Sequence, residues 1–333
     1  VDISENNLVE LIRNVRSTST SNSSNCRSFA LDFGSTEFQE MFKEQGPFDY
    51  VLNLAALKHV RSEKDTFTLS RMFKVNILNP LKLQKLCGEL DSCKYFCVST
   101  DKAANPANLM GASKLIMEKL LLSKFANVTT SFARFANVAF SDGSLPHGFL
   151  NRIENNQPLS APYDISRYFI TKLEAGQICL LSTLFGQDGE VFYPKLDLVK
   201  NQMSFKNLAE NFLRVLGFQP KLAFSERESL DMSATRMGHE TWWPCYFFES
   251  DTTGEKPLEE FYTNDEIRDE TKYFNIGVVK KSREDQNTVK ILDKISNSYE
   301  TYTPSKADFI NLVLEISPNF QHSEKGKFLD DKM

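Results

Sequence analysis

Residues 99–114 read Ser-Thr-Asp-Lys-Ala-Ala-Asn-Pro-Ala-Asn-Leu-Met-Gly-Ala-Ser-Lys, and this stretch joins an apolar, β-rich segment to a helical one. The preceding run, Lys94–Val98, predicts a buried strand, and Gly111–Lys124 predicts a helix because its aliphatic residues fall on one side. In parallel sheets, ligands bind at the carboxyl ends of the strands. The polar segment Thr100–Lys102 therefore marks a candidate reaction site.

The same alternation of strands and helices extends through the first half of the chain. Asp49–Leu54 and Thr129–Phe135 predict strands, and Thr66–Leu90 predicts a long helix. We expect Pro80 to kink this helix, because proline lacks the backbone N–H. Repeated strand–helix–strand units with short apolar strands predict an α/β fold in which helices cover a parallel sheet.

The second half of the chain is less regular. Leu173–Phe185 and Ser204–Leu216 predict helices, and Glu190–Tyr193 predicts a strand. Lys306–Ile316, which lies between two prolines, predicts a last helix. These elements predict a second, smaller α/β domain.

The composition excludes several classes of function. The 333 residues include 39 Lys and Arg and 44 Asp and Glu, so the net charge is −5 and we expect no nucleic-acid partner. No run of about 18 apolar residues predicts a membrane span, and no basic-then-apolar signal segment opens the chain. The six cysteines form no C-x-x-C pair and no zinc pattern with the four histidines, so we expect reduced thiols, no metal site and a cytoplasmic protein.

Asp101 and Lys102 place a carboxylate and an ammonium on one short loop. Partial burial would raise the pKa of the aspartate and lower the pKa of the lysine, which would bring both groups closer to neutral pH. Such a pair could act in general acid–base catalysis. The alternative is an Asp-Lys pair in a solvated turn.

A doubly wound nucleotide-binding fold opens with a strand, a Gly-rich turn and a helix. The chain contains no G-x-G-x-x-G or G-x-x-G-x-x-G, and Val1–Ile3 resembles the end of a strand. Asp2 is then expected where an acidic residue holds the adenosine ribose, and Asp32, which follows the next strand candidate, is expected near the adenine. An ordinary surface or turn aspartate is the alternative for each. We expect the first strand and the Gly-rich turn to precede Val1.

Ser99–Lys114 resembles, along its whole length, the hallmark of the extended short-chain dehydrogenase/reductases. Within that superfamily it looks like the nucleotide-sugar 4,6-dehydratases of polysaccharide biosynthesis, which act on UDP-N-acetylglucosamine. Other stretches are similar to further blocks of this family and occur in the family's order across roughly residues 1–262: Asn53–Val60, Asn76, Arg134–Val138, Ser141–Ser144, Arg167–Thr171, Asp251–Lys256 and Glu259–Phe261.

The resemblance implies a Rossmann-like doubly wound parallel sheet. It implies a dinucleotide-binding domain over residues 1–150, truncated at its N-terminus, and a mainly substrate-binding domain over residues 151–320. Residues 321–333 are expected to form a mobile tail. The implied activity is the NAD-dependent dehydration of a UDP-N-acetylglucosamine-like sugar to its 4-keto-6-deoxy product, in a protein that forms a homo-oligomer.

The resemblance also implies roles for individual residues. The catalytic residues would be Thr100, Asp101, Lys102 and Lys114. The cofactor would contact Asp2, Asp32, Ala55, Ala56, Lys58, Asn76 and Lys114. The substrate would contact Met110, Asn137, Arg167, Lys195 and Glu255.

Two departures from the family pattern bear on these roles. Met110 stands where the superfamily has its catalytic tyrosine, and methionine cannot exchange a proton, so we treat it as the mark of a subclass. Thr252 stands where many relatives have an arginine that neutralises the substrate diphosphate. Either another cation, such as Arg152 or Lys195, serves in its place, or the nucleotide differs from UDP. A nucleotide-sugar epimerase of the same superfamily and a catalytically silent binding or assembly module are the alternative functions.

Overall fold

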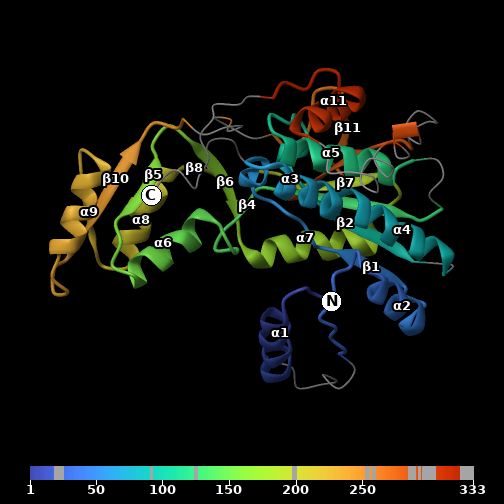
Figure 1. Cartoon of the computed structure of the whole chain (residues 1–333), viewed down its shortest axis with the longest axis horizontal. Coiled ribbons are helices and arrows are strands. Elements are labelled where there is room, and N and C mark those ends of the chain that lie inside the picture. Colours follow the sequence, from blue (N-terminus) through green and yellow to red (C-terminus); the bar gives the residue numbers. More distant parts are fainter. Residues whose placement is uncertain are drawn as a thin grey trace.

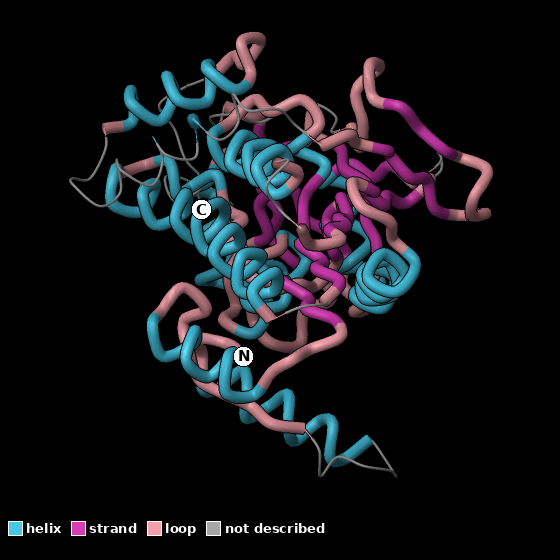
Figure 2. Tube along the Cα trace, turned by 90° about the vertical axis from the view of Figure 1, so that its right-hand side faces the viewer, coloured by secondary structure: helices cyan, strands magenta, loops and turns pink. Residues whose placement is uncertain are grey.

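The centre of the protein is a six-stranded sheet with the strand order β1-β2-β3-β7-β12-β11. In the computed structural model, α3, α4 and α5 lie on one face of this sheet and α7 lies on the other (Figure 1). The side view also places strands between helices (Figure 2). The structure describes residues 1–18, 26–90, 93–123, 127–196, 201–251, 256, 260–283, 290–291, 294 and 305–322.

Four neighbouring strands of the sheet are parallel, which confirms the predicted α/β fold. They are β1 (Tyr50–Asn53), β2 (Lys94–Thr100), β3 (Thr130–Phe135) and β7 (Glu190–Pro194). β12 (Ile276–Lys280) and β11 (Ile267–Asp269) extend the sheet in antiparallel pairing and were not predicted. The sheet is therefore parallel in its centre and antiparallel at one edge.

The long helix expected over Thr66–Leu90 is broken into three parts. α3 (Thr66–Phe73) leads into a π-helical turn, η3 (Lys74–Leu78), which leads into α4 (Asn79–Glu89). The backbone N–H of Asn79 donates to the carbonyl of Lys74, five residues earlier. The break lies directly before Pro80, which has no N–H to continue the α-helical pattern.

Other helices agree closely with the sequence pattern. α5 (Leu109–Leu121) starts two residues before the predicted range, at the Asn108 cap whose side chain accepts from the Gly111 N–H. α7 (Lys172–Phe185), α8 (Phe205–Val215) and α11 (Lys306–Ile316) lie where helices were predicted. α1 (Glu5–Thr18) and α2 (Thr36–Gln45) were not predicted.

Two three-stranded sheets lie outside the central sheet. One contains β5 (Leu159–Pro162), β10 (Trp242–Phe248) and β9 (Gln219–Leu222), and the other contains β4 (Asn137–Val138), β6 (Ser166–Ile170) and β8 (Gln202–Ser204). α6 (Leu145–Glu154), α8 and α9 (Glu226–Thr235) lie beside the first of these (Figure 1). The predicted boundary at residue 150 does not coincide with the sheets, because β7, β11 and β12 return to the central one. The roles of the two predicted domains stay predictions.

A buried network of charges joins the central sheet to α5 and to the segments around β11 and β12. The guanidinium of Arg134, on β3, donates to Glu118 of α5 at 2.7 Å and 3.0 Å, and to Glu266 at 2.8 Å. Lys281 donates to Glu118 at 2.7 Å, and so does the hydroxyl of Ser99 at 2.5 Å. The side chains of Arg134 and Glu118 are completely buried, so each depends on the other for compensation of its charge.

The charges in this network set the pKa of its carboxylates. Burial acts to raise the pKa of Glu118, but the charges of Arg134 and Lys281 and their hydrogen bonds outweigh it and hold the pKa well below its usual value. Burial also acts to raise the pKa of Glu266, and its hydrogen bond with Arg134 and that cation's charge lower it overall. Both carboxylates are therefore ionised in the folded protein at neutral pH.

None of the helices in the described part of the chain is long and apolar enough to cross a membrane.

Replacing Arg134 is expected to destabilise the fold strongly. Arg134→Met should lower the free energy of unfolding by about 3–5 kcal/mol, because the buried Glu118 and the partly buried Glu266 lose the buried one of the two cations that they share. Arg13→Met is the matched control, since Arg13 is 73% exposed and pairs with Glu10 on the surface of α1, and it should change stability by about 0.5 kcal/mol or less. Urea unfolding measures both values. Equal losses in the two variants would contradict a structural role for Arg134.

The buried network also predicts how stability depends on pH. The folded pKa of Glu118 lies below its unfolded pKa of about 4.3, so its ionisation stabilises the protein above that pH, and this contribution is lost as the pH falls toward the folded value. Glu118→Gln should be less stable at pH 7 and should lose stability less steeply between about pH 5 and pH 3. Urea unfolding at several pH values tests this, and parallel curves for wild type and variant would show that Glu118 is not involved.

Candidate active site

Three loops meet at the carboxyl ends of neighbouring parallel strands. Residues 54–60 follow β1, residues 101–108 follow β2, and the Ser141–Ser144 segment follows β3 and β4. The loops after β1 and β3 touch, because the ammonium of Lys58 lies 3.4 Å from the hydroxyl of Ser141. Gly143, with φ at +70°, allows this approach, since a Cβ at that position would lie 2.7 Å from the His59 ring.

Thr100, Asp101 and Lys102 form one connected group at the end of β2. The carboxylate of Asp101 accepts from the Thr100 hydroxyl at 2.8 Å, from the Lys102 backbone N–H at 2.9 Å and from the Lys102 ammonium at 3.2 Å. The side chain of Asp101 is 5% exposed and that of Lys102 is 19% exposed. The pair is therefore largely withdrawn from water, unlike an Asp-Lys pair in a solvated turn.

Close packing fixes the backbone around this group. Thr100 caps a short 3₁₀ turn, η4 (Asp101–Ala103), which packs against α5. Gly111 of α5 lies so close that a Cβ would sit 2.5 Å from the carbonyl oxygen of Lys102. The glycine in Met-Gly-Ala is thus required by the approach of the helix to the turn.

Lys114 lies on α5 one turn after the helix begins. Its ammonium is buried and donates to the carbonyl of Val98 at 3.0 Å, so it lies against β2 just before the Thr100–Lys102 group. Burial lowers the pKa of Lys114, although charge at Cys97 and Glu118 acts to raise it. A lysine with a lowered pKa is suited to proton exchange or to polar contact with a ligand.

Asn76 holds the loop after β1 in place. Its side-chain oxygen accepts from the backbone N–H of Leu57 at 2.9 Å, and its nitrogen donates to the Leu57 carbonyl and to the Ser113 hydroxyl, each at 3.0 Å. The side chain is completely buried within η3. These contacts make Asn76 a positioning residue for the 54–60 loop, while direct contact with a cofactor stays a prediction.

Glu63 is a site residue that sequence reasoning missed. Its buried carboxylate accepts from the backbone N–H of Met110 at 3.1 Å, at the start of α5, and pairs with the ring of His322 at 2.9 Å. Met110 itself is buried in an apolar cluster with residues such as Phe309, so a substrate contact by Met110 stays a prediction. No local pattern could have paired residues 63 and 322, which are 259 positions apart.

Lys256 and Glu260 contact the loop after β2. The ammonium of Lys256 donates to the carbonyl of Asn105, whose side chain donates to Glu260 at 2.6 Å. Asn105 belongs to one of the blocks that resemble the family, and Lys256 and Glu260 belong to two others, so residues of these blocks are neighbours in space. Glu255 lies outside the described residues, as does the expected tail beyond His322.

The other predicted substrate residues make contacts of their own. The guanidinium of Arg167, on β6, donates to the carbonyl of Ser166 and lies 5.8 Å from the centre of the Phe205 ring. Asn137 lies half-buried in β4. The ammonium of Lys195 donates to the backbone carbonyls of Glu270, Tyr273 and Phe274. Contact of these side chains with a substrate stays a prediction.

A cavity of about 1,320 Å³ brings together four of the seven predicted cofactor residues, and Lys58, Asn76 and Lys114 are not among the residues that line it. It is lined by Asp2, Asp32, Ala55 and Ala56, with apolar side chains between them. Asp2 and Ala30 form a parallel bridge on the far side of this cavity from β1. Drug-sized ligands occupy pockets of about 300–1,000 Å³, so this cavity has room for a larger one. A carboxylate for the ribose hydroxyls (Asp2), a second carboxylate expected near the adenine (Asp32), small residues at a strand end and an apolar wall fit a dinucleotide.

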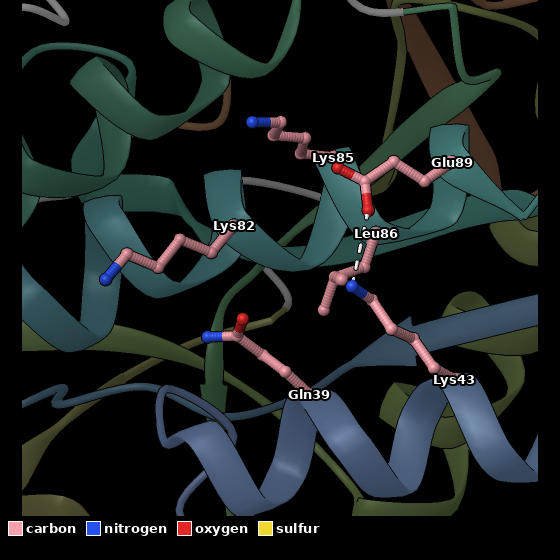
Figure 3. Close-up of a pocket in the computed structure, with 6 residues that line it drawn as sticks. All are labelled: Gln39, Lys43, Lys82, Lys85, Leu86 and Glu89. Carbon is pink, nitrogen blue, oxygen red and sulfur yellow. Dashed lines mark ion pairs between the residues drawn. The ribbon is translucent and has the colours of Figure 1, made fainter.

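A smaller cavity of about 310 Å³ lies between α2 and α4 (Figure 3). Lys43 and Glu89 point toward one another across it at 3.9 Å, whereas the ammonium groups of Lys82 and Lys85 point away from this pair. An exposed pair of this kind is weak. Four predicted cofactor residues line the larger cavity, so it is the candidate cofactor site, although Thr100, Asp101 and Lys102 are not among its lining residues.

The comparisons with known proteins agree with the fold. A family model described as "Polysaccharide biosynthesis protein" matches residues 1–281. The chain is 36% identical over 186 residues to the capsular polysaccharide biosynthesis protein CapD of Staphylococcus aureus. This match covers 55% of this chain and 30% of that protein. The chain is 33% identical over 153 residues to UDP-glucose 4-epimerase of Rickettsia bellii, which covers 44% of each. The chain thus spans less than half the length of these two curated relatives.

Two solved structures are similar in fold. Pen from Bacillus thuringiensis matches with a TM-score of 0.65 and 23% identity, over 94% of this chain and 88% of that one. The dTDP-glucose 4,6-dehydratase of Bacillus anthracis in complex with NAD matches with a TM-score of 0.52 and 14% identity, over 93% and 86%. At these identities the likeness shows the fold.

The contact between Gly111 and Lys102 can be tested by adding one methyl group. Gly111→Ala should destabilise the protein by about 1–3 kcal/mol, because either α5 or the 101–103 turn must move. Gly176→Ala is the matched control within α7, where a Cβ meets nothing within 4 Å, and it should be neutral or stabilise by up to about 1 kcal/mol. Thermal unfolding of both variants measures the difference. A Gly111→Ala variant as stable as Gly176→Ala would show that the contact is not constraining.

Proposed function

The chain belongs to the polysaccharide biosynthesis protein family, and we propose that it is an NAD-dependent enzyme that dehydrates a nucleotide-linked N-acetylhexosamine to the 4-keto-6-deoxy sugar. A UDP-N-acetylglucosamine-like compound is the proposed substrate, on the resemblance of residues 99–114 to the 4,6-dehydratases. The product would serve the synthesis of a surface polysaccharide or glycan.

The observation that carries this proposal is the group formed by Thr100, Asp101 and Lys102. A carboxylate and an ammonium lie 3.2 Å apart, mostly buried, at the carboxyl end of a central parallel strand. This is the position at which α/β sheets bind and transform ligands. A dehydration needs one group to remove a proton and another to deliver one, and an adjacent acid–base pair meets that need.

The cavity lined by Asp2, Asp32, Ala55 and Ala56 is the proposed site for NAD. Bound NAD would supply the redox chemistry by accepting a hydride from carbon 4 of the hexose and returning it to carbon 6. Within the chain, Lys114 would hold the nicotinamide ribose, and Asn76 would fix the loop that contains the two alanines. Each of these roles places or orients a group, and none requires a metal ion.

The proton transfers fall to the side chains at the end of β2. As the hydride leaves carbon 4, its hydroxyl would give up a proton to the Asp101–Lys102 pair, and Thr100 would hydrogen-bond that oxygen. Asp101 and Lys102 would also remove the proton from carbon 5 and protonate the departing hydroxyl of carbon 6, so the proton from the carbon-4 hydroxyl replaces the one that leaves with the water. Water leaves, and a proton then returns to carbon 5, so the overall change is the loss of one water molecule. Met110 cannot replace this pair, because its thioether carries no exchangeable proton.

A nucleotide-sugar 4-epimerase is the second candidate function, because a curated relative bears that name. An epimerase needs only oxidation and reduction at carbon 4, with no loss of water. The two activities are separated by the product. A 4-keto-6-deoxy sugar nucleotide supports the dehydratase, whereas a C4 epimer of unchanged mass supports the epimerase.

Removing either member of the acid–base pair should slow the reaction while the fold stays intact. We expect Asp101→Asn and Lys102→Ala each to lower kcat by about 10²–10⁴-fold. Lys82→Ala on the exposed face of α4 is the control and should keep the wild-type rate. Product formation from UDP-N-acetylglucosamine and circular dichroism of each variant measure activity and folding. Wild-type turnover in both site variants would refute the assignment.

A further inference from the structure

Residues 305–322, which include α11, pack on the helix that follows the candidate acid–base pair. α11 contacts α5, and Figure 1 shows the two helices side by side. Phe309 and Phe320 are buried in one apolar cluster with side chains of α3 and α5. The ring of Phe309 lies 4.3 Å from the ring of Phe73 on α3, measured between centroids. This segment lies beyond residues 1–281, which the family model matches.

The end of this segment reaches the start of α5 through Glu63. Nε2 of His322 lies 2.9 Å from one carboxylate oxygen of Glu63, and the other oxygen accepts from the backbone N–H of Met110 at 3.1 Å. The side chain of Glu63 has no exposure to water, and that of His322 is 8% exposed. Glu63 ends the short helix η2 (Val60–Glu63), which follows the loop after β1. One buried carboxylate therefore joins this loop, the start of α5 and the C-terminal segment.

A carboxylate without contact to water depends on its partners, because burial of an uncompensated charge is costly. The first N–H groups of a helix lack partners within the helix and form the positive end of its dipole, so Glu63 stabilises the start of α5. Asn108 already caps this helix by accepting from the Gly111 N–H. The added carboxylate and its bond to His322 are therefore explained by the place in which they hold the helix.

The position of the start of α5 determines the position of the candidate catalytic groups. Gly111 directly follows Met110, and a Cβ on it would lie 2.5 Å from the carbonyl oxygen of Lys102. Lys114 follows one turn later and donates to the carbonyl of Val98 in β2. A shift at the start of α5 would therefore move Lys114 and displace the turn that contains Lys102. A misplacement of about 1 Å can lower the rate of a reaction on the order of 100-fold.

We propose that residues 305–322 form a strap that holds the start of α5 in its catalytic position, with His322 and Glu63 as positioning residues. This inference rests on the proposed function, because it concerns the placement of Asp101, Lys102 and Lys114. His322 and Glu63 act through the backbone N–H of Met110 and touch no substrate. Release of the strap would lower turnover, so the C-terminal segment regulates the site.

Hydrogen exchange measured by mass spectrometry tests the strap without any need for activity. His322→Leu removes the partner of Glu63, so amides of residues 108–114 should exchange at least about tenfold faster, while those of β3 keep the wild-type rate. His322→Gln is the conservative variant, because a carboxamide can donate to Glu63, and its exchange should stay within about threefold of wild type. Glu315→Gln is the matched control. It breaks an exposed ion pair of α11 with Lys294 and should exchange as wild type does.

Turnover of UDP-N-acetylglucosamine is the second readout. His322→Leu should lower kcat at least about tenfold and change KM by about threefold or less, because the strap places reacting groups. His322→Gln and Glu315→Gln should keep kcat within about threefold of wild type. Because a buried charge without its partner can prevent folding, Glu63→Gln combined with His322→Leu is the second variant, and it leaves no charge buried. It should show the same fast exchange and the same loss of kcat.

Each outcome supports or overturns the strap. Wild-type exchange at residues 108–114 in both site variants would show that the inference is wrong, while the proposed function stands. Equally faster exchange in β3 and α5 would indicate a role in overall stability alone and would overturn it, and so would failure of both variants to fold. Faster exchange at the start of α5 with an unchanged kcat would contradict the positioning role. If wild type forms no 4-keto-6-deoxy product, the proposed function and the positioning role fall together, and the exchange rates still decide whether residues 305–322 hold α5.

Discussion

The fold depends on one buried cation. Arg134 lies in the middle of the central sheet, and its guanidinium joins Glu118 of α5 to Glu266 before β11. A charge with no exposure to water is tolerated only where opposite charges and hydrogen bonds compensate for it. The strand, the helix and the edge of the sheet must therefore take up their positions together. Ser99 is the first residue of the stretch that contains the candidate acid–base pair, and its hydroxyl also bonds to Glu118. The network is therefore connected directly to that stretch.

Local sequence patterns predicted the elements that place the site. β2 and α5 are specified by a run of apolar residues, a capping asparagine and helical spacing, all within about 30 positions. Lys306–Ile316 was predicted with the bounds that the structure shows, because prolines flank it in the sequence, and the structure adds a capping box of Ser305 and Asp308 at its start. The position of Thr100–Lys102 at a strand end followed from the same local reasoning. The burial of the pair could not be read from the sequence, since it depends on the packing of α5 against the turn.

The elements and contacts that were missed depend on distant parts of the chain. β12 pairs with β7 across about eighty residues, and Glu63 meets His322 from the far end of the described chain. α1 was missed although Leu8, Ile12 and Val15 fall at helical spacing, and of these only Leu8 is buried in the structure. The π turn before Pro80 was expected only as a kink, yet it places Asn76 against one loop and Asn79 in the cavity wall.

The contact between Gly111 and the carbonyl of Lys102 has a consequence for the way a ligand could enter. With no gap between them, α5 and the turn after β2 behave as one rigid body, and neither can swing open on its own. Any breathing motion of the site then falls to the loops after β1 and β3, which meet through the bond between Lys58 and Ser141 at the exposed rim. The floor of the candidate site would then stay still while the loops on its two sides move apart.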